Sequence, residues 1–509
     1  MANEDKKDFN AMLHDSKDMP KFQIIIDQKS IEKYGGNKMY FAPPIDYDKV
    51  MKKVPYGKVI TVGKIREHFA KLSGADFTEP ITAGIFVSIV AWASYQRSED
   101  ETPYWRTLKA NGELNAKYPN GIEAQKEKLW EMADFIFDHP EYRGKEYQAC
   151  DLLTKYLTDN GFSVEKSVGG YETSFRAEWK HGEGGPVIGI LCEYDALEGL
   201  GHGCGHHMQG PSCLGAAVAL KECAGEEPFT LVVYGTPAEE TLGSKCDMIK
   251  NGCFHELDAA FMMHGSPTTC TDVKCLADQS FRVTFHGKRA HAALAPEQGR
   301  SAFDALLVAF NGIEFLREHV PDDVRMHYTV AELPGPANVV PVKSVGKFSL
   351  RSFSKEELKG VVSRFKDIIK GAALIAGVDY ELEQTSDFYN KIPVLKLNEL
   401  LMENAKLAGA PRLAPPREKT GSTDFGNVMY EIPGSCIRVA FVPEGTSSHS
   451  QEFVDAGKTQ AARDCILYGA KSIAGASMDL ITKPELMDEV KAEFAENLSL
   501  FLSFLNRLI

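Results

Sequence analysis

The chain has 509 residues, of which 43% are hydrophobic, 25% charged and 10% aromatic. This is the composition of an ordinary globular protein, and it excludes collagen, low-complexity disorder and a small disulfide-stapled domain. The formal net charge of −14 also argues against a surface that binds polyanions along the whole chain.

Residues 1–20 are polar and charged, and we expect them to form a flexible N-terminus. From 21 to 123, short amphipathic segments alternate with turn signals, which indicates a small module of its own. Between positions 51 and 75 this module carries six basic side chains against the single acidic Glu67. Such a stretch is either a local basic patch or the solvated face of a helix.

Two helices are then predicted, over 122–137 and 145–160. From Pro186 the pattern changes to an alternation of strand, loop and helix. Continuous apolar runs, typical of strands that are buried on both faces, occur at 186–191, 229–234, 259–263 and 437–441. A doubly wound α/β domain is therefore predicted over 124–275 and 392–509.

Between 276 and 391 the order of the predicted elements becomes strand, helix, strand, strand, helix, strand. These elements are 280–285, 301–319, 327–333, 344–351, 355–376 and 380–385. This is the order of a ferredoxin-like β-α-β-β-α-β unit. We expect it to be a separate small domain inserted into the α/β domain.

The cysteines and the apolar segments predict where in the cell the protein is located. Eleven scattered cysteines indicate reduced thiols in a cytoplasmic protein. The segment Met1–Lys7 contains no apolar run, so we expect no secretory signal. The longest apolar stretch, Ile81–Ala93, has 13 residues, whereas a membrane helix needs about 20. No membrane association is expected.

Polar clusters lie where the predicted buried strands of the α/β domain end. The clusters are Cys204 with His206, Glu239 with Glu240, His264, and His449. In an open parallel sheet the carboxyl ends of the strands line one crevice, so these clusters can converge. Imidazole, thiolate and carboxylate groups suit zinc or a neighbouring transition metal.

Each cluster also has a simpler explanation. His264 alone is compatible with a hydrogen-bonded core histidine, and adjacent glutamates often begin a solvated helix. A Cys–His pair can be a nucleophile with its base. Because all the clusters follow apolar strands, where charged groups need partners, the pattern favours a metal hydrolase. In that hypothesis one glutamate holds metal, while its neighbour takes a proton from the water that attacks the substrate carbonyl.

Eight short motifs strengthen this hypothesis. They are Glu193–Leu197, Gly199–His206, Thr236–Glu240, Met263–His264, Gly287–Ala292, Asn338–Pro341, Gly421–Asp424 and His449–Ser450. In these motifs and their order, residues 124–509 resemble the aminoacylase / glutamate carboxypeptidase family of two-metal amidohydrolases. The nearest branch resembles p-aminobenzoyl-glutamate hydrolase and β-alanyl-lysine dipeptidase, and is related to the auxin-conjugate hydrolases. The resemblance implies a dipeptidase or amidohydrolase that cleaves a dipeptide or N-acyl amino acid.

The resemblance also implies a role for each matched residue. The implied metal ligands are Cys204, His206, Glu240, His264 and His449. They would hold a divalent metal, two ions per subunit, with zinc preferred and manganese as the alternative. Glu239 would be the general base, and Asp195 would orient a ligand.

The inserted domain would be the family's dimerisation lid, so a homodimer is expected. Its His291 would stabilise the oxyanion, reaching into the partner subunit's site. Asn338 and Arg351 would hold the substrate carbonyl and carboxylate, arginine because its planar fork matches a carboxylate.

The chain departs from the family pattern at two positions. His207 replaces the usual asparagine after Cys-Gly-His, as either an extra ligand or a surface residue. Glu193 occupies the position where other branches place a metal-binding histidine, which leaves the identity and number of the metals open. His202 is interpreted as a loop histidine.

A second resemblance concerns the N-terminal module. The stretches Val54–Val59, Thr61–Ile65, Pro103–Arg106 and Gly112–Asn115 resemble the winged-helix domain of alkylguanine-DNA alkyltransferases and alkyltransferase-like proteins. Tyr104 stands where that family has its acceptor cysteine, which excludes alkyl transfer.

DNA binding by this module is an alternative. The helix predicted near 80–95 is apolar and offers no arginine, and this favours a docking or stabilising module. The alternative function is a DNA-binding or ligand-sensing fusion protein whose hydrolase domain is a binding scaffold. The presence of Glu239 and of all five implied ligands argues against it.

Overall fold

The computed structural model describes residues 7–55, 58–97, 99–110, 112, 122–418 and 420–503. The chain divides into two compact units, Met1–Lys126 and Glu127–Ile509. Within the described ranges, no helix combines the length and the apolar character that a membrane span requires. Each unit is considered by itself.

The first unit is a small α+β module. It holds a three-stranded sheet of order β1-β2-β4 and a two-stranded parallel ladder of β3 and β5. Its elements are α1 (Phe9–His14), β1 (Lys21–Ile24), α2 (Gln28–Tyr34), β2 (Lys38–Phe41), α3 (Pro44–Lys52), β3 (Ile60–Thr61), α4 (Val62–Ser73), β4 (Phe77–Thr78), α5 (Pro80–Tyr95) and β5 (Thr107–Leu108).

The apolar helix α5 forms the centre of this unit's core. The Glu79 carboxylate accepts hydrogen bonds from the first backbone N–H groups of α5, and the helix buries Phe86 against Tyr47. Tyr104, which replaces the acceptor cysteine, is buried in the same core. The winged-helix interpretation stays a prediction, because Tyr56, Gly57 and 113–115 of its motifs lie outside the described residues.

The second unit is built around a six-stranded sheet of order β15-β10-β8-β9-β7-β6. Its strands are β6 (Ser163–Lys166), β7 (Phe175–His181), β8 (Val187–Cys192), β9 (Phe229–Gly235), β10 (Ala259–Ser266) and β15 (Gly434–Ala440). The strands β15, β10, β8 and β9 run parallel, whereas β7 pairs antiparallel with β9 and β6 pairs antiparallel with β7. The parallel strands place their carboxyl ends at one edge of the sheet.

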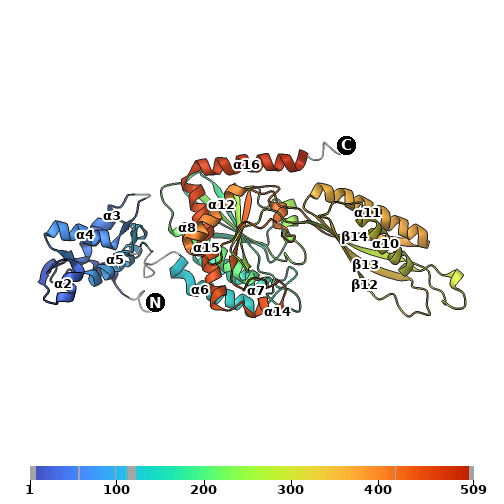
Figure 1. Cartoon of the computed structure of the whole chain (residues 1–509), viewed down its shortest axis with the longest axis horizontal. Coiled ribbons are helices and arrows are strands. Elements are labelled where there is room, and N and C mark those ends of the chain that lie inside the picture. Colours follow the sequence, from blue (N-terminus) through green and yellow to red (C-terminus); the bar gives the residue numbers. More distant parts are fainter. Residues whose placement is uncertain are drawn as a thin grey trace. The chain divides into compact units, whose positions relative to one another are not determined.

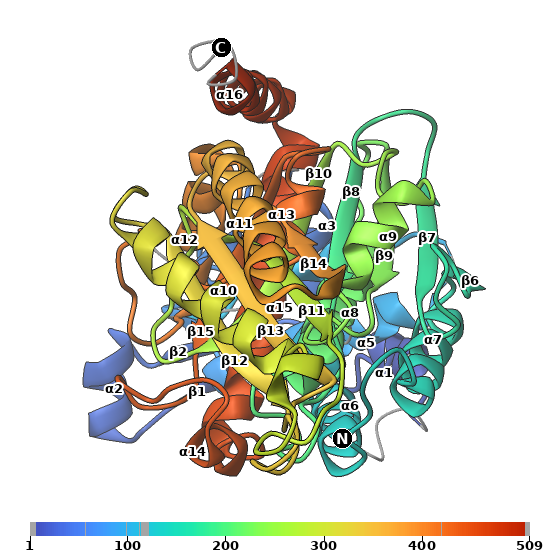
Figure 2. The same ribbon diagram turned by 90° about the vertical axis from the view of Figure 1, so that its right-hand side faces the viewer.

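Helices cover both faces of this sheet, as Figure 2 shows. Helices α8, α12 and α15 pack on one side of β8, β10 and β15, while α9 and α13 share an apolar core with β8 and β9 on the other. The helices are α6 (Ile122–Asp138), α7 (Tyr147–Asp159), α8 (Gln209–Glu222), α9 (Ser244–Lys250), α12 (Leu395–Ala408), α13 (Phe425–Val428), α14 (Gln451–Asp455), α15 (Gln460–Thr482) and α16 (Pro484–Ser503). The predicted doubly wound α/β fold is confirmed.

The chain leaves this sheet after β10 and forms a second, four-stranded antiparallel sheet of order β12-β13-β11-β14. Two helices cover one of its faces (Figure 1) and bury an aromatic core that includes Phe281, Phe348 and Phe365. The elements are β11 (Ala277–His286), α10 (Ala302–Arg317), β12 (Arg325–Glu332), β13 (Lys343–Ser352), α11 (Lys355–Ala376) and β14 (Asp379–Phe388). The predicted ferredoxin-like order is confirmed, and we call this part the lid.

Candidate metal centre

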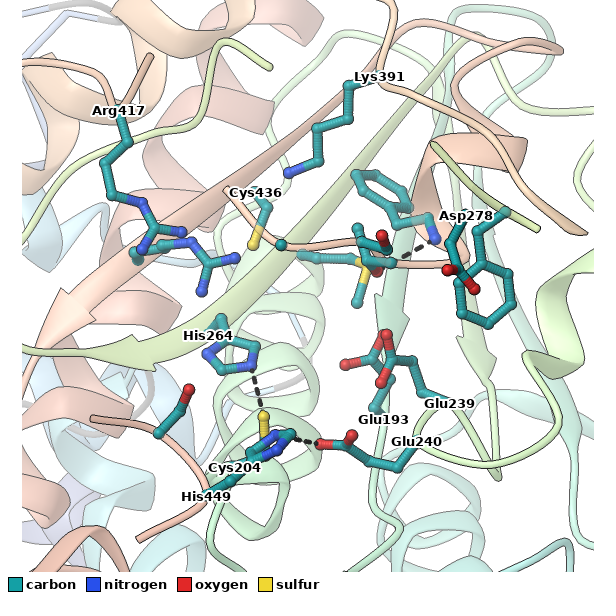
Figure 3. A pocket seen from close by; sticks show the side chains of 18 of the residues that line it. Glu193, Cys204, Glu239, Glu240, His264, Asp278, Lys391, Arg417, Cys436 and His449 are labelled. Carbon is teal, nitrogen blue, oxygen red and sulfur yellow. Dashed lines mark hydrogen bonds and ion pairs between the residues drawn. The ribbon is translucent and has the colours of Figure 1, made fainter. Parts of the chain in front are cut away.

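A cleft of about 370 Å³ lies at the carboxyl ends of the parallel strands. The six-stranded sheet contributes residues that follow β8, β9 and β15, together with His264 near the end of β10. The lid contributes Asp278 and Arg351. Figure 3 shows the acidic side chains Glu193, Glu239 and Glu240 gathered in the middle of this cleft.

The five sequence-predicted ligands come together in this cleft in overlapping groups. The ligand atoms of Cys204, His206 and His264 lie within 4.8 Å of one another, as do those of Cys204, Glu240 and His449. The Cys204 Sγ lies 3.4 Å from His264 Nε2, and His449 Nε2 lies 3.2 Å from Glu240 Oε1. A third group joins His206 with Glu239 and Glu240. His264 lies in β10, whereas the other ligands come from loops and turns that follow different strands.

Unusual backbone conformations bring these side chains into the cleft. Gly205 has a φ of +81°, and a Cβ there would lie 3.0 Å from the Met208 side chain, so glycine is needed between Cys204 and His206. His449 (φ 62°) and Ala238 (φ 55°) are non-glycine residues in the same left-handed region. Such conformations cost about 1–3 kcal/mol and cluster at functional sites.

The neighbours of the two central histidines fix which ring nitrogen faces the cleft. His206 Nδ1 is 3.0 Å from Asp195 Oδ1, and Asp195 Oδ2 accepts a hydrogen bond from the backbone N–H of Glu240 at 2.9 Å. His264 Nδ1 donates to the Gly265 carbonyl at 2.7 Å. In both rings Nε2 is left to bind a ligand in the cleft, as in histidines that coordinate metals.

A buried ion network, which sequence reasoning missed, supports the acidic centre. Lys245 is fully buried, and its Nζ donates to Glu193 Oε1 and to Asp424 Oδ1, both at 2.7 Å. Gln209 also donates to Glu193. Although burial raises the pKa of Glu193, the Lys245 ammonium and the His206 imidazole lower it to about 2. Glu193 is therefore held as a carboxylate.

The donor groups of the cleft fit divalent cations. Glu240 Oε1 is buried and accepts no hydrogen bond from the described residues, although His449 Nε2 lies 3.2 Å from it. Burial and the carboxylates of Glu193, Glu240 and Asp424 raise the pKa of Glu239 well above its usual range. A bound cation would stabilise these buried carboxylates in their charged form. The combination of thiol, imidazole and carboxylate groups suits zinc and similar ions.

The lid residues predicted to bind substrate fall into two places. Arg351, on β13, lines the cleft, where its Nε lies 3.1 Å from Asp278 and its Nη1 donates to Ser422 across the cleft at 3.4 Å. His291 and Asn338 are exposed side chains that do not line this cleft. They are neighbours, because Ala292 donates its backbone N–H to the Asn338 carbonyl.

The two other histidines of the ligand loop point away from the cleft. His207 is buried, so it is not the surface residue that the sequence allowed, and its Nε2 contacts the Gly457 carbonyl at 2.9 Å. Burial lowers the pKa of His207 to about 4. His202 is likewise buried, against the Ile136 carbonyl. Both pack beside Phe137 as core histidines.

A buried carboxyl group lies beneath the site, immediately before α7. Glu146 accepts hydrogen bonds from the Gly144 N–H and the Thr173 hydroxyl. Burial, with a contribution from the Asp195 carboxylate, raises the pKa of Glu146 to about 7. The folded protein therefore holds this proton to a higher pH than the unfolded chain, in which a glutamate titrates near about 4.3.

Glu146→Gln is expected to stabilise the protein at high pH alone. The stabilisation of the native protein by its bound proton is complete below the unfolded pKa and is lost as pH rises through about 7. We expect the free energy of unfolding of the variant to exceed that of the native chain by about 2 kcal/mol at about pH 8. At about pH 5 the difference should be less than about 1 kcal/mol. Urea unfolding at both pH values measures this, with the exposed Glu165→Gln as control. A difference that does not change with pH would contradict it.

Comparison with known proteins identifies the family. The model of peptidase family M20/M25/M40 matches residues 190–475, which is more than half of the chain. The chain belongs to this family. The Xaa-Arg dipeptidase of Mus musculus is 32% identical to this M20 peptidase over 397 residues, covering 75% of this chain and 92% of that protein.

Two further relatives agree with this assignment. A p-aminobenzoyl-glutamate hydrolase subunit of Escherichia coli (strain K12) is 28% identical over 451 residues, covering 74% of this chain and 93% of that protein. A dinuclear metal-binding M20 peptidase of Bacillus subtilis has the same fold, with a TM-score of 0.54 at 19% identity over 69% of this chain and 98% of that one. The predicted amidohydrolase or dipeptidase branch is confirmed. This M20 peptidase is a metal-dependent hydrolase that acts on an amide or peptide bond of a small substrate.

Proposed function

We propose that this M20 peptidase hydrolyses a dipeptide or an N-acyl amino acid with a free carboxylate, using two divalent ions, zinc in preference to manganese. The observation that carries the proposal is the convergence of five ligand side chains around Glu239 in one cleft. The names of its two relatives, a dipeptidase and a hydrolase of p-aminobenzoyl-glutamate, describe substrates of this kind. The proposed metal ligands are Cys204, His206, Glu240, His264 and His449.

Divalent ions, when bound, supply Lewis acidity, which polarises the amide carbonyl and lowers the pKa of water from about 15.7 towards about 7. Glu239 is the proposed proton acceptor. It takes a proton from the attacking water as the new carbon–oxygen bond forms, and passes it to the amine nitrogen as the carbon–nitrogen bond breaks. Asp195 acts through His206, whose Nδ1 it holds at 3.0 Å.

The two adjacent glutamates differ in their surroundings, which supports different roles. Glu240 faces His449, and its backbone N–H is tied to Asp195. Glu239 lies beside Glu193 and Asp424, which Lys245 holds in place. These contacts support Glu240 as a ligand beside His449 and Glu239 as the proton acceptor beside Glu193 and Asp424.

Arg351 is the proposed partner of the substrate carboxylate. It is carried by the lid, and its guanidinium reaches Ser422 of the catalytic domain. A planar guanidinium binds a carboxylate through two parallel hydrogen bonds. Asp278, beside it, holds the side chain over the cleft.

We also propose a homodimer formed through the lid. The lid helices α10 and α11 expose Phe315 (74%), Leu374 (73%) and Ile375 (75%), an apolar surface that a second copy would cover. His291 and Asn338 are exposed away from their own cleft, which is the arrangement needed to serve the partner subunit's site. Light scattering is expected to give twice the 56.2 kDa mass of one chain, and a monomer would contradict the proposal.

For the N-terminal unit we propose a docking or stabilising module of the winged-helix type. Helix α5 exposes Ile81 (72%) and Ile85 (50%) and contains no basic residue, which disfavours DNA as its partner. A cytoplasmic location is part of the proposal. It is supported by eleven cysteines, none of them in a disulfide.

Removal of metal is expected to abolish hydrolysis of a dipeptide and N-acyl amino acid panel, and return of zinc or manganese to restore it. The metal content should be two ions per chain in the native protein. Cys204→Ser should lower it, because a hydroxyl group is a poorer ligand than a thiolate. Cys223→Ser, at the end of α8 and away from the cleft, is the matched control. Hydrolysis that is unaffected by chelation would overturn the proposed function.

A further inference from the structure

The wall of the cleft beside His264 has three basic side chains but only one carboxylate that pairs with them. Arg417, Arg438 and Lys391 all line the cleft, and all three donate to one carboxylate, that of Asp272. Asp272 is buried and accepts hydrogen bonds from these three cations at 2.8–3.0 Å. One negative charge is therefore surrounded by three positive ones, and we call these four residues the cationic wall.

The two arginines use only one edge of their guanidinium groups to hold Asp272. Arg417 donates through Nε at 2.8 Å, and Arg438 donates through Nε to both carboxylate oxygens, at 3.0 and 2.9 Å. In the part of the chain that the structure describes, no group accepts a hydrogen bond from the Nη atoms of either arginine. The outer edges of both guanidinium groups are thus available to a ligand.

Backbone pairing fixes the cationic wall next to the metal centre. Arg438 is paired with His264 across the parallel strands β15 and β10. Arg438 also exchanges backbone hydrogen bonds with Cys270, and Arg417 lies in a bridge with Asp272. The side chain of Arg438 is 16% exposed and that of Arg417 is 35% exposed, so both reach the cleft.

The lid arginine lies elsewhere in the cleft and is paired through its Nε with a single carboxylate. Arg351 pairs with Asp278, and Figure 3 shows Asp278 and Arg417 on opposite sides of the cleft. The cleft therefore offers two separate positions for an anion, one at Arg351 and one at Arg417 and Arg438. The cationic wall has the larger excess of positive charge, and it repels a cationic side chain.

We propose that Arg417 and Arg438 bind a second carboxylate of the substrate, so that this enzyme prefers dicarboxylates. This inference rests on the proposed function, because it assumes that Arg351 takes the first carboxylate. The second carboxylate belongs either to the side chain of an acidic amino acid or to the acyl group. The Nη groups bind it by charge-assisted hydrogen bonds, while Asp272 and Lys391 keep both guanidinium groups in place.

Two pairs of substrates test the preference and locate the carboxylate. If N-acetyl-glutamate is hydrolysed in preference to N-acetyl-glutamine, the second carboxylate is on the amino-acid side. If N-succinyl-leucine is preferred to N-succinamoyl-leucine, it is on the acyl side. In each pair a carboxylate is exchanged for an amide of the same size. In the metal-loaded full chain we expect kcat/KM to favour the acid in one pair by about 10- to 100-fold, the effect of hydrogen bonds to a charged group.

Arg417→Gln and Arg438→Lys are the diagnostic variants. Arg417→Gln leaves two cations for Asp272, and Arg438→Lys keeps the charge but removes the fork. Both should reduce the ratio of kcat/KM between acid and amide substrates to below about threefold. Arg412→Gln is the matched control, since Arg412 lies in the same segment but donates to the Pro267 and Val442 carbonyls.

A binding measurement separates this inference from the proposed function. Calorimetry with glutarate and with its monoamide should show glutarate bound about tenfold more tightly, with the difference lost in Arg417→Gln. If none of the four substrates is hydrolysed but this difference is found, the proposed function fails and the anion site stands. An acid preference that is missing in both pairs, or that persists in both arginine variants, overturns the inference.

Discussion

Replacing Glu239 by glutamine is expected to lower kcat/KM at least about 100-fold, the low end for removal of a general base. Glutamine has the same size and keeps a hydrogen-bonding group in the cleft, but it cannot accept a proton from water. The five proposed ligands are unchanged, so the variant should bind metal like the native protein. Steady-state hydrolysis of the best dipeptide substrate measures the effect.

The control for this experiment is Glu444→Gln. Glu444 is an exposed glutamate in the loop that precedes His449, outside the residues that line the cleft. Glu444→Gln makes the same chemical change close to the site. The activity of this variant should remain within about twofold of the native value, as for an ordinary surface substitution. Full activity in Glu239→Gln would remove the proposed mechanism and leave the binding-scaffold alternative.

Replacing Lys245 by methionine is expected to lower the free energy of unfolding by about 3–5 kcal/mol. The variant leaves the carboxylates of Glu193 and Asp424 buried without their cation, and removal of one partner from a buried ion pair is strongly destabilising. Urea unfolding of the metal-depleted full chain measures this term, because bound metal would offset part of the lost charge.

Lys250→Met provides the comparison on the same helix. Lys250 pairs with Asp247 at the surface, its side chain is 73% exposed, and an exposed pair contributes about 0–1 kcal/mol. Adding Asp424→Asn to Lys245→Met should restore part of the loss, since it removes one uncompensated charge. A loss below about 1 kcal/mol in Lys245→Met would show that the buried network does not stabilise the fold.

The elements that the sequence predicts well are those with strong periodicity. Strands β8, β9 and β10 are continuous apolar runs, and the predicted helix at 355–376 coincides with α11. The edge strand β6 and its neighbour β7 are not predicted from the sequence. Their burial alternates irregularly and β6 is mostly exposed, so they lack the apolar run that marks a central strand.

The convergence of the ligand side chains was predictable because the ends of parallel strands share one edge. The network around Lys245 was not, since nothing in its sequence neighbourhood marks this lysine as buried. Arg438 does carry a signal: a charged residue within the apolar strand β15 requires a buried partner. The identity of that partner, Asp272, depends on a bridge between distant segments that periodicity does not report.

The path of the chain through the lid has a mechanical consequence. The chain enters the lid through β11 and leaves it through β14. These two strands pair antiparallel, and their pairing begins with Asp278 opposite Phe388. Both crossings therefore lie side by side, so a rotation of the lid about them would change the backbone angles of only a few residues. Such a rotation moves Arg351 as part of a rigid body, which adjusts its separation from Glu239 without repacking either hydrophobic core.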